Sequence, residues 1–175
     1  SVVTSEAAVY NNRTIYNIPS GAPDWSPLHG DHSLRFRYPA GGVMAEQRFT
    51  LDKPYKELWF QYWVRVPTNF YHGQNSPNNH KFFAIWMDGY SHKGDGATLI
   101  WEMWGDASGS NDIAFHHSSG DYTGTGGFDG HKDFITVPED RGRWMEITIH
   151  VKSSSVGSAD DGVIELWRRW AGDPT

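Results

Sequence analysis

The stretch Glu57-Leu58-Trp59-Phe60-Gln61-Tyr62-Trp63-Val64-Arg65-Val66-Pro67 decides the fold of this 175-residue chain. Its even positions hold Leu, Phe, Tyr and Val, and its odd positions hold Glu, Trp, Gln, Trp and Arg. Successive side chains of a strand point to opposite faces, so one face here is aliphatic and aromatic while the other mixes rings with polar groups. Such sustained alternation predicts a β-strand rather than a helix.

The same alternation recurs along the chain, and no segment carries the apolar spacing of a helix over three turns. The further alternating segments are Ser33–Pro39, Lys81–Tyr90, Thr98–Asp106, Asp112–His117, Arg143–Lys152 and Gly162–Trp170. The chain's 19 glycines and 9 prolines are spread throughout and divide it into short elements. The sequence therefore predicts one all-β domain over residues 1–175, a jelly-roll sandwich of two antiparallel sheets.

Composition excludes several classes of partner and chemistry. The net charge of −6 and the absence of a basic run argue against nucleic acid, and no apolar run approaches the roughly 20 residues of a membrane span. With no cysteine there is neither a disulfide framework nor a thiol nucleophile. Aromatic residues make up 15% of the chain, which indicates an unusually aromatic core or a surface that uses rings for recognition.

The polar face of the decisive strand is the first candidate surface. Trp59 and Trp63 could stack on sugar rings while Gln61 and Arg65 bind hydroxyls and carboxylates. The alternative is that this face forms the core and the Leu/Phe/Tyr/Val face is exposed. Three residues of neighbouring strands join the substrate-binding candidates, namely Glu102, Trp104 and Trp167. For Glu102, pairing with a nearby arginine is an equally good interpretation.

Polysaccharides are cleaved by hydrolysis or by β-elimination, and the two reactions need different side chains. The Glu-x-Asp-x-x-Glu pattern of jelly-roll hydrolases is absent, which disfavours hydrolysis by paired carboxylates. Elimination needs a base for the proton beside a uronate carboxyl, and a group that neutralises that carboxyl. Tyr62 and His80 are the candidate bases, and Gln61 and Arg65 could neutralise the carboxyl. Tyr62 and Arg65 fall on opposite faces of one strand, so the preferred catalytic set is His80 with Gln61 and Arg65. The alternative is that His80 is only a polar residue where a loop enters a strand.

Metal signals are weak, and no catalytic metal or organic cofactor is predicted. The Asp-rich turns Gly105–Asp112 and Ser158–Gly162 could hold a structural Ca²⁺ through carboxylate and carbonyl oxygens. Turns also favour Asp, Asn and Gly for backbone reasons alone, so both interpretations stay open.

Three stretches, residues 30–41, 57–70 and 142–152 followed by 161–167, together resemble polysaccharide lyases of the glucuronan-lyase and heparinase-like type, in the concanavalin A-like lectin/glucanase superfamily. The resemblance implies a jelly roll whose curved sheet binds an acidic polysaccharide and cleaves it by β-elimination, in an extracellular or a virion- or cell-surface protein. The family pattern continues further past Trp167, which would make this domain shorter at its C-terminus. Two alternatives remain: a non-catalytic carbohydrate-binding domain, and a structural or adhesive surface protein.

Overall fold

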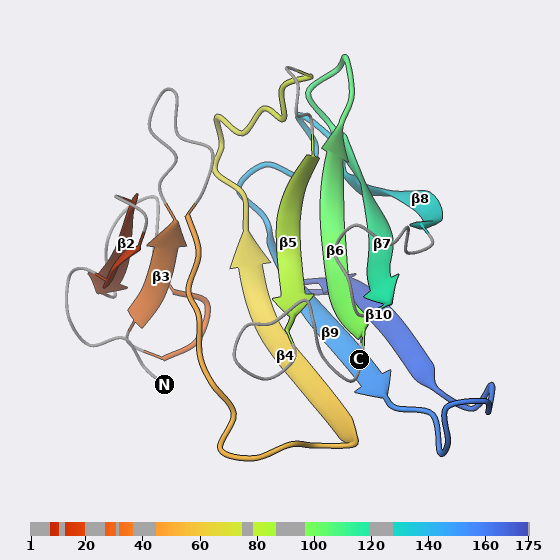
Figure 1. Cartoon of the computed structure of the whole chain (residues 1–175). Coiled ribbons are helices and arrows are strands. Elements are labelled where there is room, and N and C mark those ends of the chain that lie inside the picture. The colour runs from red at the N-terminus through yellow and green to blue at the C-terminus, as the bar shows by residue number, and fades with distance from the viewer. Residues whose placement is uncertain are drawn as a thin grey trace. The chain divides into compact units, whose positions relative to one another are not determined.

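The computed structural model describes residues 8–10, 13–19, 27–30, 32–36, 45–74, 79–86, 97–119 and 128–174. Within these ranges the protein is all-β, with ten strands and no helix (Figure 1). The strands are β1 (Ala8–Tyr10), β2 (Arg13–Pro19), β3 (His32–Phe36), β4 (Glu57–Arg65), β5 (Asn79–Ile85), β6 (Ala97–Gly105), β7 (Asn111–Ser119), β8 (Phe128–Ile135), β9 (Trp144–Lys152) and β10 (Val163–Trp170). The predicted all-β class is confirmed.

The strands form antiparallel sheets in two compact units. Unit 1 comprises Ser1–Val64 and Trp144–Thr175, and unit 2 comprises Arg65–Arg143. Unit 1 holds the sheets β1-β2-β3 and β10-β9-β4, and unit 2 holds the sheet β5-β6-β7-β8. β4 runs antiparallel to β9, as the arrows in Figure 1 show. The 2.8 Å hydrogen bond from the Ser153 N–H to the Lys56 carbonyl, just beyond the paired ends of the two strands, is consistent with this direction. That the chain is one domain stays a prediction.

The central strand of the β10-β9-β4 sheet supplies the core of unit 1. Met145, Ile147 and Ile149 of β9 are at most 1% exposed, since they all fall on one side of the strand. The other side of β9 carries Glu146 and His150, which are buried too, so both faces of this strand are covered. A polar side chain buried at the centre of a sheet requires hydrogen-bond partners from the strands beside it.

Unit 2 has its core on its two central strands and on the end of β8. Ile100 and Trp101 of β6 are almost fully buried, as are Phe134 and Ile135 of β8. The register between β5 and β6 shifts between Lys81 and Phe83, and Phe82 packs edge-on against Phe134 with 5.1 Å between ring centroids.

Two glycines let the loop after β4 lie against the turn between β6 and β7. A Cβ at Gly105 would lie 2.6 Å from the His72 ring, and a Cβ at Gly109 would lie 2.2 Å from the Tyr71 ring. Gly109 also has a φ of +87°, a conformation that other residues rarely adopt. The His72 N–H donates to the Gly109 carbonyl at 2.9 Å, which fixes His72 in this position.

Candidate functional site

One side of the β10-β9-β4 sheet carries a group of polar and aromatic side chains, and we call it the tryptophan face. Its members are Glu57, Trp59, Gln61 and Trp63 of β4, Glu146, Thr148, His150 and Lys152 of β9, and Glu165, Trp167 and Arg169 of β10. Trp59 is 60% exposed and Trp167 is 45% exposed. The polar face of the decisive strand is therefore turned outward at Trp59, and the aliphatic side of β9 is turned inward.

His150 holds the three strands of this sheet together. Its Nδ1 lies 2.8 Å from Glu165 Oε2 on β10, and its Nε2 lies 2.7 Å from Glu57 Oε1 on β4. An ionised carboxylate only accepts hydrogen bonds, so both ring nitrogens must donate and the ring is an imidazolium. The two carboxylates, Glu165 first, raise the pKa of His150 above its ordinary value. The hydrogen bond from His150 lowers the pKa of Glu57.

Aromatic stacking covers this charged cluster. The Trp59 ring lies parallel to the His150 ring with centroids 3.8 Å apart, and the side chain of His150 is only 9% exposed. Trp167 is parallel to Trp59 within 3°, with a centroid separation of 5.9 Å. Two exposed indole rings from the two outer strands of the sheet thus share one orientation, and the Trp59 ring covers the buried imidazolium.

The next part of the tryptophan face is a cation–π arrangement around Trp63. The Arg169 guanidinium lies over the Trp63 ring at 5.7 Å and forms an ion pair with Glu146, which is opposite it on β9. His29 contacts the Trp63 ring edge-on at 5.5 Å. Trp63 is therefore half-buried, and Gln61, between Trp59 and Trp63 on β4, is exposed.

Unit 2 contains a second group of polar aromatic side chains around His80. The His80 ring stacks on the His72 ring at 4.7 Å, and partial burial lowers the pKa of His80. Asn111 Oδ1 accepts the Ile135 N–H at 3.2 Å, so its Nδ2 is the atom that lies 3.2 Å from His72 Nδ1 and donates to it. His72 therefore carries its proton on Nε2 and is neutral. Its neighbour His80, with a lowered pKa, is neutral at pH 7.

Strand register separates His80 from the other predicted residues of unit 2. His80 is opposite Met103, whereas Glu102 is opposite Lys81 and Trp104 is opposite Asn79. Directly opposed residues share a face, so Glu102 and Trp104 lie on the side of the sheet away from His80. Glu102 is buried between Lys81 on β5 and its partner Ala114 on β7.

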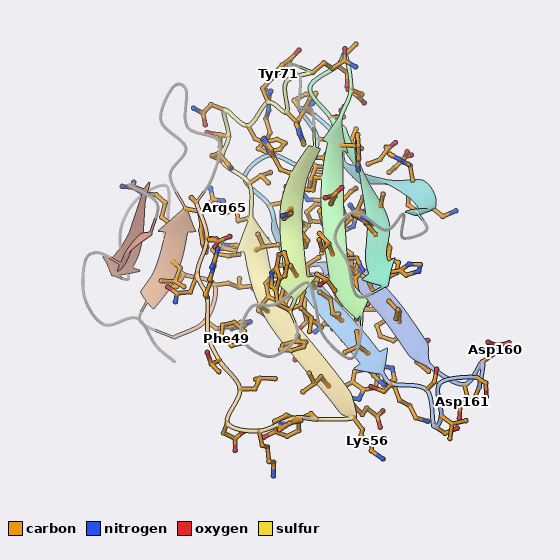
Figure 2. All side chains as sticks on the ribbon, viewed as in Figure 1. Phe49, Lys56, Arg65, Tyr71, Asp160 and Asp161 are labelled. Atoms are coloured by element: carbon orange, nitrogen blue, oxygen red, sulfur yellow. The ribbon has the colours of Figure 1, made fainter. Side chains whose placement is uncertain are left out.

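The predicted catalytic set is distributed over both units. Gln61 belongs to unit 1, while Arg65 and His80 belong to unit 2. Arg65 is half-buried at the end of β4, and its guanidinium lies near Gly142 (Figure 2). Tyr62, the alternative base, is half-buried, and this burial raises its pKa, which makes it a poorer proton acceptor at neutral pH. The structure groups Trp59 with Trp167 among the predicted binding residues.

Sequence reasoning missed the groups that organise both clusters. The tripeptide Glu-Leu-Trp occurs at Glu57–Trp59 and again at Glu165–Trp167, and these are the segments that hold His150 from either side. This repeat was the available signal. His72 and Asn111 had none, because each stands in a polar, turn-rich segment where such residues are common.

The candidate calcium turns use their carboxylates for the backbone. Asp106 accepts the N–H groups of Ser108 and Ser110, and Asp161, in the turn that joins β9 to β10, accepts the Ser155 N–H at 2.8 Å (Figure 2). The hydrogen bond from the Ser108 hydroxyl, followed by the backbone bonds, lowers the pKa of Asp106, and the bond from the Ser155 N–H lowers the pKa of Asp161. In the described ranges, no three His, Asp or Glu side chains are grouped closely enough to hold a metal ion. Calcium binding stays a prediction.

Comparisons with known proteins give no independent guide to this site. A scan against protein-family models and searches of curated proteins and of solved structures each returned no match to the chain. In the part of the chain that the structure describes, no helix has the length and apolar character to cross a membrane.

Proposed function

We propose that the protein binds carbohydrate through the tryptophan face, with Trp59 and Trp167 as the two rings that contact the glycan. The observation that carries the proposal is their geometry: Trp59 and Trp167 are 60% and 45% exposed, and their rings lie parallel within 3° with centroids 5.9 Å apart. A large exposed ring is costly in water unless a ligand covers it. Flat faces of sugar rings present C–H groups that suit an indole, and the hydroxyls at their edges need polar partners.

The polar partners stand beside the rings. Glu57 and Glu165 each lie two residues before a tryptophan on the same strand, so each carboxylate is on the same face as its ring. The exposed Gln61 adds an amide that both donates and accepts. The ion pairs of His150 hold the carboxylates in place before a ligand arrives, which reduces the entropy lost on binding.

Affinity electrophoresis against a panel of soluble polysaccharides tests the proposal. Trp59→Ala and Trp167→Ala should each weaken retention by at least about tenfold, equivalent to ~1.4 kcal/mol. Phe49→Ala is the matched control, because Phe49 is an aromatic residue with 59% exposure in the segment before β4 and is not a member of the tryptophan face (Figure 2). Equal retention of all three variants, or an equal loss in all three, would reject the tryptophan face as the binding surface.

A second candidate function is β-elimination on an acidic glycan, and the observation that favours it is the neutral His80. A neutral imidazole can accept a proton, and the stacked His72 holds it in one orientation. His80→Ala should then abolish the release of unsaturated uronate, detected by its ultraviolet absorbance, while His131→Ala leaves it unchanged. Failure to detect such product from any polyuronate would remove this candidate.

We also propose that the strands form a jelly-roll sandwich of two antiparallel sheets, and that the protein is extracellular or lies on a cell or virion surface. The supporting feature is that the β10-β9-β4 sheet of unit 1 and the sheet of unit 2 both have central strands with buried apolar side chains, as the layers of a concanavalin A-like jelly roll require. A glycan partner would place the protein outside the cell or on a cell or virion surface. Localisation by fractionation of the source culture, with a cytosolic enzyme as marker, tests this setting.

A further inference from the structure

The charges of the tryptophan face balance within the face itself. The three carboxylates are Glu57, Glu146 and Glu165, and the three cations are His150, Lys152 and Arg169. His150 contacts two of the carboxylates and Arg169 contacts the third. Lys152 is close enough to Glu57 to lower its pKa further. Among the members that define this face, every cation is thus matched by a carboxylate.

The two carboxylates beside the tryptophan rings are more accessible to a ligand than the imidazolium that they share. The side chains of Glu57 and Glu165 are 48% and 45% exposed, whereas that of His150 is 9% exposed and covered by the Trp59 ring. Arg169 is oriented toward Glu146 and the Trp63 ring. A ligand lying on Trp59 and Trp167 would therefore meet carboxylate oxygens beside the rings, with the imidazolium beneath Trp59, while the exposed Lys152 stands at the end of β9.

From this distribution we infer that the tryptophan face binds a glycan without carboxylate or sulfate groups. The inference rests on the carbohydrate-binding function proposed above. Carboxylates accept strong hydrogen bonds from sugar hydroxyls, so an uncharged glycan gains contacts from Glu57 and Glu165. The carboxylate of a uronate, or a sulfate, offers no proton and would be repelled by the same two groups, since the nearby His150 and Arg169 are already paired with carboxylates. This substrate class differs from the acidic glycan that the family resemblance implies.

The test uses pairs of oligosaccharides that differ only in charge. Each pair consists of a neutral β-1,4-glucan, β-1,3-glucan or α-1,4-glucan hexamer and its C6-oxidised, uronate counterpart. Titration calorimetry of the full chain with both members should show the neutral member of at least one pair bound about tenfold more tightly. The preference should shrink when ionic strength rises from about 0.01 M to about 0.15 M, because the Debye length falls from ~30 Å to ~8 Å.

A charge variant tests the role of the carboxylates directly. Glu165→Gln keeps an oxygen that accepts the His150 hydrogen bond and removes one negative charge, so the neutral-over-uronate ratio should fall several-fold. Glu139→Gln, at an exposed position of unit 2, is the control and should leave the ratio unchanged.

Two outcomes overturn the inference, and they differ from each other. If a uronate member binds at least as tightly as its neutral partner, and Trp59→Ala abolishes that binding, the face binds carbohydrate and the inferred class is wrong. If no member of any pair binds in a way that depends on Trp59, the carbohydrate-binding function itself fails, and the inference fails with it.

Discussion

Replacing Asn111 by alanine should destabilise unit 2 strongly and disturb the stacked histidines. Asn111 is 2% exposed, its Oδ1 accepts the N–H of the buried Ile135, and its Nδ2 donates to His72. Loss of both bonds, with the Ile135 N–H left unsatisfied, should cost about 2–4 kcal/mol. For a chain of this size that corresponds to a fall in melting temperature of about 4–16 °C.

Two measurements separate this interpretation from a general packing defect. Urea denaturation of Asn111→Ala should show the full loss, whereas Asp112→Ala, at the next and half-exposed position of β7, should change stability by about 0.5 kcal/mol or less. An NMR titration of the His80 ring in Asn111→Ala should give a pKa closer to the ordinary value of 6.5, because burial lowers the pKa of His80 and a His72 ring released from Asn111 would bury it less. Equal stability of the two variants, or an unchanged His80 titration, would refute the reasoning.

Three further predictions concern the frame of each unit. His150→Gln should lower the free energy of unfolding most between about pH 4.5 and 6.5. The raised pKa of His150 contributes stability that is lost as pH rises through that pKa, and the lowered pKa of Glu57 contributes stability that is lost as pH falls through that pKa. A pH-independent difference between wild type and variant in urea titrations would contradict the ion pairs. Gly109→Ala should lower stability by more than about 1 kcal/mol, because its φ is +87° and the new Cβ would meet Tyr71, while Gly157→Ala, where nothing lies within 4 Å, should be nearly neutral in thermal melts. Ile147→Ala should cost about 2–5 kcal/mol because the side chain is fully buried, and Ile164→Ala, at 44% exposure, much less; similar denaturation midpoints would show that β9 is not the core strand of unit 1.

Strand positions and faces could be predicted because they depend on local alternation. The odd positions of β4 were expected outward, and the exposure of Trp59 follows that pattern. The aliphatic set Met145, Ile147 and Ile149 marked the buried side of β9 in the same way. Periodicity of two is a property of each strand by itself, so no knowledge of neighbouring strands was needed.

Contacts between strands could not be predicted, because they depend on register. His150 looked like an ordinary outward polar residue, and only the pairing of β9 with both β4 and β10 reveals its two carboxylate partners. His80 was placed with Glu102 in one groove, yet the pairing of β5 with β6 sets them on opposite faces. A shift of one residue in register exchanges the two faces, and nothing local in the sequence fixes that choice.

The most direct test of the central claim is the NMR response of the indole N–H groups during titration with a neutral oligosaccharide. The tryptophan indole signals are assigned by substitution. If both rings contact the same ligand, the Trp59 and Trp167 signals should shift progressively and saturate together. The signal of Trp101, which is 3% exposed in β6, should stay in place. Saturable binding that leaves the Trp59 and Trp167 signals unshifted, or no binding by any glycan tested, would contradict carbohydrate binding by the tryptophan face.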